Sequence, residues 1–162
     1  MYDNDSIHPV LFNQREQINA GGNTVTNIVD TAGFSGGMLV VTVLLDALNS
    51  ATVFDKLQLQ ESDASSTGYS IIEGCNALTD NQADGSSAPT FDNESDHSMI
   101  IFYVPLMGAR KRYYRVRLNN TGSGNAGVSC TALIIGGQNP TSPASSSLVD
   151  GTDGAIFRAV TT

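Results

Sequence analysis

Residues 38–45 have the sequence MLVVTVLL. It is the most apolar part of the chain and is rich in Val and Leu, and its length suits a strand better than a helix. A strand without polar residues at alternate positions is expected to be central and covered on both faces. Residues 97–104 are a second continuous apolar run, so we expect a second strand of this kind there.

Strands with an alternating pattern surround these two runs. In residues 54–62, Leu57 and Leu59 are expected to face inward, and the polar residues between them outward. Residues 113–118 alternate in the same way, which places Tyr114 inside. Further strands are predicted at residues 24–30, 69–72 and 128–135.

This series predicts an all-β protein, because turn signals separate the strands and no convincing amphipathic helix occurs. Two packed antiparallel sheets of about seven or eight strands would bury the apolar sides, which makes an antiparallel β-sandwich the expected fold. A jelly roll and a simpler Greek-key sandwich both satisfy the pattern. An open barrel is the less favoured alternative.

The expected domain organisation is an N-terminal arm (1–22), the sandwich (23–137) and a C-terminal arm (138–162). The N-terminal arm is polar and irregular. The C-terminal arm has no periodicity, yet it contains the apolar residues Ile156 and Phe157 near its end. An apolar tip on a flexible tether is typical of an arm that docks on a neighbouring molecule, and a frayed tail is the alternative.

The charge of the chain limits its partners. The chain contains sixteen Asp and Glu residues and eight Lys and Arg residues, which gives a formal net charge of −8. Nucleic-acid binding is disfavoured because phosphate contacts need a basic footprint. No apolar run reaches the length of about 18 residues that a membrane-spanning helix needs, and the start of the chain does not resemble a signal peptide. We therefore expect synthesis in the cytoplasm and no membrane partner.

One basic cluster stands out in this acidic chain. Five of the eight cations lie close together, namely Arg110, Lys111, Arg112, Arg115 and Arg117. Segregated charge of this kind lets one face of a molecule meet the opposite charge of a neighbour. The alternative is local, since Arg115 and Arg117 could pair with carboxylates on an adjacent strand. The five cations, with Ile156 and Phe157, are the candidate protein-contact residues.

A catalytic or metal-binding constellation is not recognisable. His8 and His97 have no nucleophile at a familiar spacing. Asp92, Glu94 and Asp96 alternate and could offer oxygen ligands to Ca²⁺, but the EF-hand pattern is missing, and a solvated acidic loop is the favoured interpretation. We expect no catalytic residue, no cofactor and no metal.

Two further patterns have simple structural interpretations. Gly122, Gly124 and Gly127 form a G-x-G-x-x-G string, but it lies between two predicted strands and is expected to be a hairpin loop rather than a dinucleotide site. Cys75 and Cys130, the only cysteines, are expected to be buried thiols rather than a bridge.

Four strings in order carry a resemblance to a known family. They are TNIVDTAGFSGGMLVVTVLL (26–45), DKLQLQESD (55–63), YVPLMGARKRYYRVRL (103–118) and VSCTALIIGGQNP (128–140). The series is similar to small tailed-phage proteins that are often encoded near the major capsid protein, and the resemblance covers residues 24–140. Two departures are the KLQLQESD string, which is two residues longer than the KLQESD of the family, and the long continuation beyond Pro140.

The resemblance implies a virion structural protein, and specifically a capsid decoration (cement) protein. Such a protein adds to an assembled shell and helps it to resist internal pressure. The implied partners are the major capsid protein and further copies of the chain, with a trimer favoured, and the implied location is the virion. The alternatives are a β-sandwich component of the phage tail or head-to-tail connector, and a carbohydrate-binding β-sandwich, which the absence of Trp disfavours. An enzyme is the weakest alternative.

Overall fold

The computed structural model describes residues 7–25, 28–32, 34, 36–48, 50–82, 84–88, 91, 98–136 and 154–158. All regular secondary structure in these residues is β-strand. The strands are β1 (Ile7–Ile18), β2 (Asn23–Val25), β3 (Val29–Asp30), β4 (Met38–Asp46), β5 (Phe54–Ser62), β6 (Ser70–Asn76), β7 (Ser98–Pro105), β8 (Tyr113–Asn120), β9 (Ala126–Ile135) and β10 (Gly154–Arg158).

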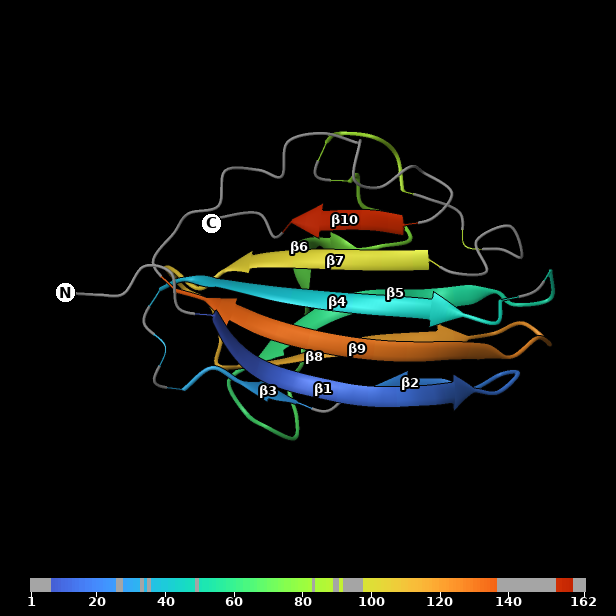
Figure 1. The fold of residues 1–162 in the computed structure, drawn as a ribbon, viewed down its shortest axis with the longest axis horizontal. Helices are drawn as coiled ribbons and strands as arrows, with labels where there is room; N and C mark the ends of the chain where they lie inside the picture. The colour runs from blue at the N-terminus through green and yellow to red at the C-terminus, as the bar shows by residue number, and fades with distance from the viewer. Residues whose placement is uncertain are drawn as a thin grey trace.

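The strands form two sheets that pack face to face (Figure 1). Sheet A has the order β1-β9-β4-β7-β10, and sheet B has the order β2-β8-β5-β6, with β3 also pairing with β8. All neighbouring strands are antiparallel except β10, which runs parallel to β7. The predicted antiparallel β-sandwich is therefore confirmed.

The pairing order also decides between the two topologies that the sequence left open. β1 pairs with β9, β2 and β3 pair with β8, β4 pairs with β7, and β5 pairs with β6. The chain is thus one long antiparallel ribbon that turns back on itself between β5 and β6, and successive pairs belong to sheets A, B, A and B. Wrapping the ribbon adds the β4–β9 and β5–β8 pairs that complete the sheets. This arrangement is a jelly roll.

The core lies between the sheets because each strand turns alternate side chains inward. Leu57 and Leu59 of β5 are buried, as expected, and Tyr114 of β8 lies inside with them. From sheet A, β4 contributes four inward residues that are each at most 1% exposed: Leu39, Val41, Val43 and Leu45.

The strand at residues 38–45 was expected to be covered on both faces, and this expectation is wrong. Val40 and Thr42 are only half-buried, and Leu44 is 47% exposed. Within the described residues, the apolar run is buried on its inner face and open on its outer face.

Both expected arms contain a strand of sheet A. Residues 7–18 of the region expected to be irregular form β1, which pairs with β9. Residues 154–158 form β10 on the other edge of the same sheet. The sandwich thus extends beyond the expected boundaries at residues 23 and 137. A further difference is that residues 24–30 were expected as one strand, whereas β2 and β3 are two short ones.

Candidate interaction surfaces

The outer side of sheet A carries a group of residues that we call the open face. Along β4, β7 and β9 these residues alternate with the inward-facing ones. The strand register aligns them in three rows, each crossing the three strands. The rows are Tyr103–Val40–Leu133, Ile101–Thr42–Thr131 and Met99–Leu44–Ser129.

The open face has an unusual composition for the outer side of a sheet. Five of its residues are Val, Leu, Ile or Met, one is Tyr, three are Ser or Thr, and none is charged. An antiparallel sheet normally turns polar side chains to solvent on its outer side. Sheet A lies toward the viewer in Figure 1, and no described element crosses in front of β4, β7 and β9. The face is thus both apolar and uncovered by the described part of the chain.

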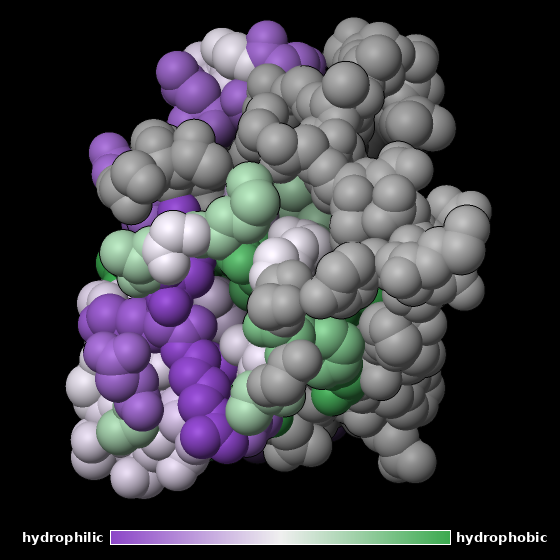
Figure 2. All heavy atoms as spheres, turned by 90° about the vertical axis from the view of Figure 1, so that its left-hand side faces the viewer, coloured by the Kyte–Doolittle hydropathy of each residue, from purple (hydrophilic) through white to green (hydrophobic). Residues whose placement is uncertain are grey.

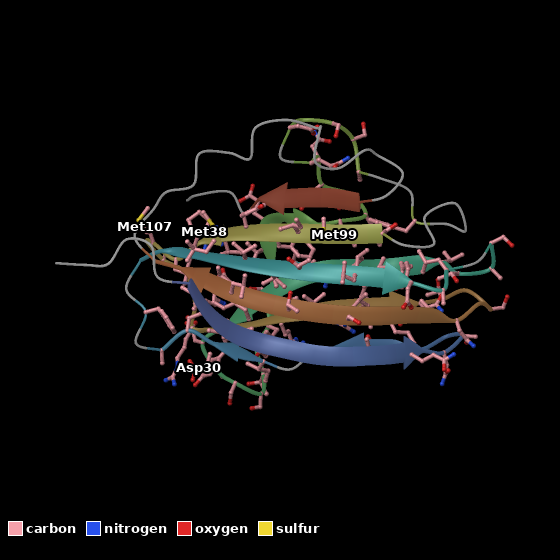
Figure 3. The ribbon with its side chains drawn as sticks, viewed as in Figure 1. Asp30, Met38, Met99 and Met107 are labelled. Carbon is pink, nitrogen blue, oxygen red and sulfur yellow. The ribbon has the colours of Figure 1, made fainter. Side chains whose placement is uncertain are left out.

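The limits of the open face are visible along β4. Met38 continues the same alternation at one end of the strand but is buried, at 1% exposure. Asp46 continues it at the other end and is the first charged residue. Met99 marks the row nearest to Asp46 and is labelled on β7 in Figure 3.

The outer side of sheet B has the opposite character. Arg115 and Arg117 of β8 lie there with Lys56 of β5, and we call these three residues the basic face. The guanidinium of Arg115 donates from Nε to Oε1 of Gln60 at 3.0 Å and lies 3.9 Å from the ring centre of Tyr69. Among the described residues, Arg115 therefore contacts an amide and an aromatic ring rather than the carboxylate that a purely local pairing would need.

Arg115 also explains an unexpected feature of β5. Gln58 and Gln60 point outward, as predicted, yet they are only 5% and 4% exposed. Gln60 stands opposite Arg115 in the register, and Gln58 stands opposite Arg117. Long arginine side chains can cover a neighbouring polar residue with their apolar stems while their charged ends stay near solvent.

Arg110 belongs to the end of the core rather than to a free surface. Its Nη1 lies 3.4 Å from Oε1 of Glu61, and both side chains are only 12% exposed. Glu61 stands opposite the inward-facing Tyr114 in the register. The backbone N–H of Lys111 donates to the other oxygen of Glu61, also at 3.4 Å. The pair ties the chain before β8 to the end of β5.

Arg112 is likewise paired within the chain. Its Nε and Nη2 donate to the two carboxylate oxygens of Asp30, each at 2.7 Å, and its guanidinium lies 4.8 Å from the ring centre of Tyr113. The bond from Arg112, followed by the backbone N–H of Ala32, lowers the pKa of Asp30 to about 2. This pair is exposed at the end of the sandwich where Asp30 is labelled in Figure 3.

The five predicted basic residues thus have different roles. Arg110 and Arg112 make ion pairs inside the chain, whereas Arg115 and Arg117 lie on the basic face. Lys111 lies between the two ion pairs along the chain. Ile156 and Phe157 lie in β10, opposite Ile101 and Phe102 of β7 in the strand register, and their side chains are outside the described part of the structure.

A surface pocket of about 410 Å³ is lined by Arg110 and Arg112, the cations of these two ion pairs. Figure 2 looks onto this end of the molecule, where hydrophilic residues form a band beside a more apolar area. The buried hydroxyl of Tyr114 has no hydrogen-bond partner among the described residues, and burial, followed by the Glu61 carboxylate, raises its pKa. The lining residues are Thr31, Ala32, Phe34, Gly36, Asp63, Leu106, Gly108, Arg110, Lys111, Arg112 and Tyr114.

The remaining sequence candidates do not assemble into a site. His97, Asp92, Glu94 and Asp96 lie outside the described residues, as does the side chain of His8. In the part of the chain that the structure describes, no group of three or more His, Cys, Asp or Glu is placed to hold a metal ion.

The glycine string lies in a loop between two strands, as expected, but the predicted hairpin is wrong. Gly122 and Gly124 lie in the connection from β8 of sheet B to β9 of sheet A, which do not pair with one another, and Gly127 lies in β9 itself. The cysteines have the structural role that the sequence predicted. Cys75 and Cys130 are buried free thiols and form no disulfide with one another. Burial raises the pKa of both thiols, to about 12 for Cys130.

Sequence reasoning missed the open face, although its signal was present. The signal is the lack of polar residues at alternate positions of 38–45, which predicts coverage on both sides. The pattern does not say whether the cover comes from the same chain or from another molecule.

Comparison with known proteins adds no assignment. No protein-family description matches the sequence, and no curated protein is similar to it at a significant level. Among the described residues there is no helix of the length and apolarity that crossing a membrane would require.

Proposed function

We propose that this protein is a structural component of a tailed-phage virion, a capsid decoration protein that binds the shell as a homo-oligomer and stabilises it. The observation that carries the proposal is the uncharged, apolar open face on an otherwise acidic jelly roll. Large exposed apolar patches on folded proteins usually serve contacts with other molecules. The sequence resemblance supplies the phage context, and the jelly roll is an architecture used in viral capsid proteins.

The mechanism is physical rather than catalytic. Each contact removes apolar surface from water, which stabilises the assembly by about 25 cal/mol per Å². A shell presents the same site many times, so an oligomer can engage several sites at once and gain avidity. We propose no catalytic residue, cofactor or metal for this function.

The basic face is the proposed contact with the major capsid protein. It gathers Lys56, Arg115 and Arg117 on one side of a chain whose net charge is −8. Such a face suits a partner surface that presents carboxylates, because complementary charge steers association and fixes orientation. Arg110 and Arg112 are not proposed as primary contacts, because carboxylates of the same chain already pair with them. Lys56 also lies 3.8 Å from a carboxylate oxygen of Asp55, so Arg115 and Arg117 are the main contacts that we propose on the basic face.

The decisive experiment uses purified particles and purified heads. The protein should be present in many copies per particle by quantitative mass spectrometry, and added protein should bind to heads that lack it. Replacing Arg115 and Arg117 by Gln should weaken this binding at least about tenfold, and raising the salt concentration should do the same for the native chain. Replacing Lys111 by Gln is the matched control, since it removes a nearby cation that lies outside the basic face.

Absence from particles together with no binding to heads would refute the proposal. Few copies confined to one vertex or to the tail would favour the alternative, a tail or connector component. The carbohydrate-binding alternative has less support, because Arg115 already covers the ring of Tyr69, the residue just before β6. A glycan array that shows no saturable binding would exclude the carbohydrate-binding alternative.

A further inference from the structure

We propose that Arg115 is a preformed binding site for a single carboxylate of the partner protein, and that Gln60 and Tyr69 are the positioning residues that hold its guanidinium in place. The inference rests on the proposed function and deepens it, because it names the chemical group that the basic face receives and the side chain that receives it. The site is tested first on the isolated protein with acetate, so its failure and the failure of capsid binding can be told apart.

A neutral group fixes one edge of the Arg115 guanidinium. Its Nε donates to Oε1 of Gln60 at 3.0 Å. Gln60 is only 4% exposed and stands opposite Arg115 in the strand register, so the acceptor belongs to the packed surface of the sheet. An amide oxygen accepts this bond without cancelling the positive charge, whereas a carboxylate would cancel it. The side chain is therefore oriented while its charge stays available to a partner.

The ring of Tyr69 covers one face of the same guanidinium. The guanidinium carbon of Arg115 lies 3.9 Å from the centre of the ring, which is a cation–π contact. The ring is itself anchored, because the hydroxyl of Tyr69 donates to the carbonyl of Ser65 at 3.1 Å. The backbone N–H of Ala64 in the same turn donates to the hydroxyl of the buried Ser62. A carboxylate that binds Arg115 therefore restricts the side chain less than one that binds an unrestrained arginine.

These two contacts leave the far end of the guanidinium open. Among the described residues, Nη1 and Nη2 of Arg115 have no hydrogen-bond partner, and Arg115 makes no ion pair. A guanidinium can hold a carboxylate with two bonds, either from Nε and Nη2 or from Nη1 and Nη2. Arg112 uses Nε and Nη2 to hold Asp30. In Arg115 the amide of Gln60 occupies Nε, so Nη1 and Nη2 remain for a carboxylate of the partner.

Arg117 lacks this arrangement, although it lies two residues further along the same face of β8. It stands opposite Gln58 in the register. In the part of the chain that the structure describes, its side chain neither bonds to that amide nor contacts an aromatic ring. Arg117 therefore attracts a partner by its charge, which lysine also carries. Arg115 offers an oriented planar fork, which lysine cannot replace.

The first test follows the side-chain N–H signals of Arg115 and Arg117 by NMR while acetate replaces chloride at constant ionic strength. Half-saturation at Arg115 should need an acetate concentration at least about threefold lower than at Arg117. Gln60→Glu should abolish this preference, because the new carboxylate pairs with Arg115 inside the chain. A merely structural role of Gln60 would leave the preference unchanged, since this variant keeps an acceptor for Nε.

The role of the Tyr69 ring is tested in the same titration. Tyr69→Leu removes the ring and should weaken acetate binding at Arg115 about threefold. Tyr69→Phe keeps the ring and should retain most of the binding. Thermal unfolding of each variant verifies that it is folded, so a loss of binding in a stable variant reports on the site.

The second test measures binding of the full-length protein to purified heads at constant salt. Arg115→Lys should weaken binding at least about tenfold, and Arg117→Lys only about twofold, because both keep the charge and only the first removes an oriented fork. Equal effects of the two substitutions, no preference of acetate for Arg115, or a preference that survives Gln60→Glu would overturn the inference. If acetate prefers Arg115 as expected but the native protein does not bind heads, the carboxylate site stands and the capsid proposal fails.

Discussion

Arg110 and Glu61 form an ion pair at the end of the sandwich, with 3.4 Å between Nη1 and Oε1 and both side chains 12% exposed. Arg110 is one of the five cations that sequence reasoning grouped as a contact surface. The pair instead joins the chain before β8 to the end of β5, where Glu61 stands opposite the buried Tyr114 in the strand register.

Breaking this pair should destabilise the fold. Arg110→Ala leaves the mostly buried carboxylate of Glu61 without its partner, and we expect a loss of about 2 kcal/mol in the free energy of unfolding. Urea unfolding followed by circular dichroism measures the change. Lys111→Ala is the control and should shift stability by less than about 0.5 kcal/mol, because only its backbone N–H contacts Glu61. Equal effects of the two substitutions would contradict a structural role for the Arg110 side chain.

The Asp30–Arg112 pair should be visible as a pH effect. The folded-state pKa of Asp30 is about 2, below the ordinary value of 3.8. The stabilisation from this depressed pKa is fully present above the ordinary value and is lost as the pH falls from about 4 toward 2. NMR titration of the Asp30 carboxyl carbon measures the pKa directly. Arg112→Ala should raise it toward 3.8, and an unchanged titration in that variant would show that the pair does not form in solution.

Asn120 should be essential to the loop that connects β8 of sheet B to β9 of sheet A. The residue is fully buried. Its Nδ2 donates to the carbonyl of Gly124 at 2.6 Å, and its Oδ1 accepts from the backbone N–H groups of Val53 and Gly122 at 3.2 and 3.0 Å. Asn120→Ala leaves these buried backbone groups without their hydrogen-bond partners, so we expect a loss of about 2–3 kcal/mol in the free energy of unfolding.

Denaturant unfolding of Asn120→Ala provides that measurement. Ser123→Ala, an exposed residue of the same turn, is the control and should be nearly neutral. A neutral Asn120→Ala would mean that water replaces the bonds of its side chain.

The two cysteines should be inert in the folded protein. Burial raises the pKa of Cys130 to about 12 and raises that of Cys75 as well, so both remain thiols at neutral pH. Thiolate is the reactive form, and neither side chain is accessible to reagent. Maleimide labelling followed by mass spectrometry should modify both cysteines in denaturant and neither in the native state. Rapid native labelling of either would show that this part of the core opens.

Removing β10 should expose the edge of sheet A. A chain that ends at residue 153 lacks the parallel partner of β7, and an unpaired edge strand is a template for association with other chains. We expect faster hydrogen exchange in β7, a loss of roughly 1–3 kcal/mol in stability and more aggregation. A chain that ends at residue 160 keeps β10 and should behave like the full protein.

The outcome for head binding separates two roles of the C-terminal region. If the chain that ends at residue 153 is folded yet binds heads poorly, the region also contacts a neighbour, as its apolar residues predict. Unchanged exchange in β7 would mean that β10 does not pair with it in solution.

The positions of strands could be predicted from the sequence where the local pattern of apolar residues was strong. The run at residues 38–45 and the alternation at residues 54–62 correspond to β4 and β5 almost residue for residue. β1 was missed because residues 7–18 mix polar and apolar residues without a clear period. β10 was missed because five residues near a chain end give little periodic signal, and its pairing with β7 depends on contacts distant in sequence.

The roles of the basic residues could be predicted from the sequence only in part. Their clustering between residues 110 and 117 is a property of the sequence. Which of them pair internally depends on where Asp30 and Glu61 lie in space, and these carboxylates are 82 and 49 residues away from their partners, Arg112 and Arg110.

An acidic, all-β sandwich could be predicted from the amino-acid sequence, because side-chain alternation and turn residues act over a few positions. The jelly-roll order of the strands, the internal pairing of Arg110 and Arg112, and the exposure of the outer side of β4 at Val40, Thr42 and Leu44 became known only from the three-dimensional structure. Strand order and coverage depend on which distant segments meet, and the energy of those contacts has no local signature. The apolar run at residues 38–45 thus also carries part of the open face, where we expect a partner molecule.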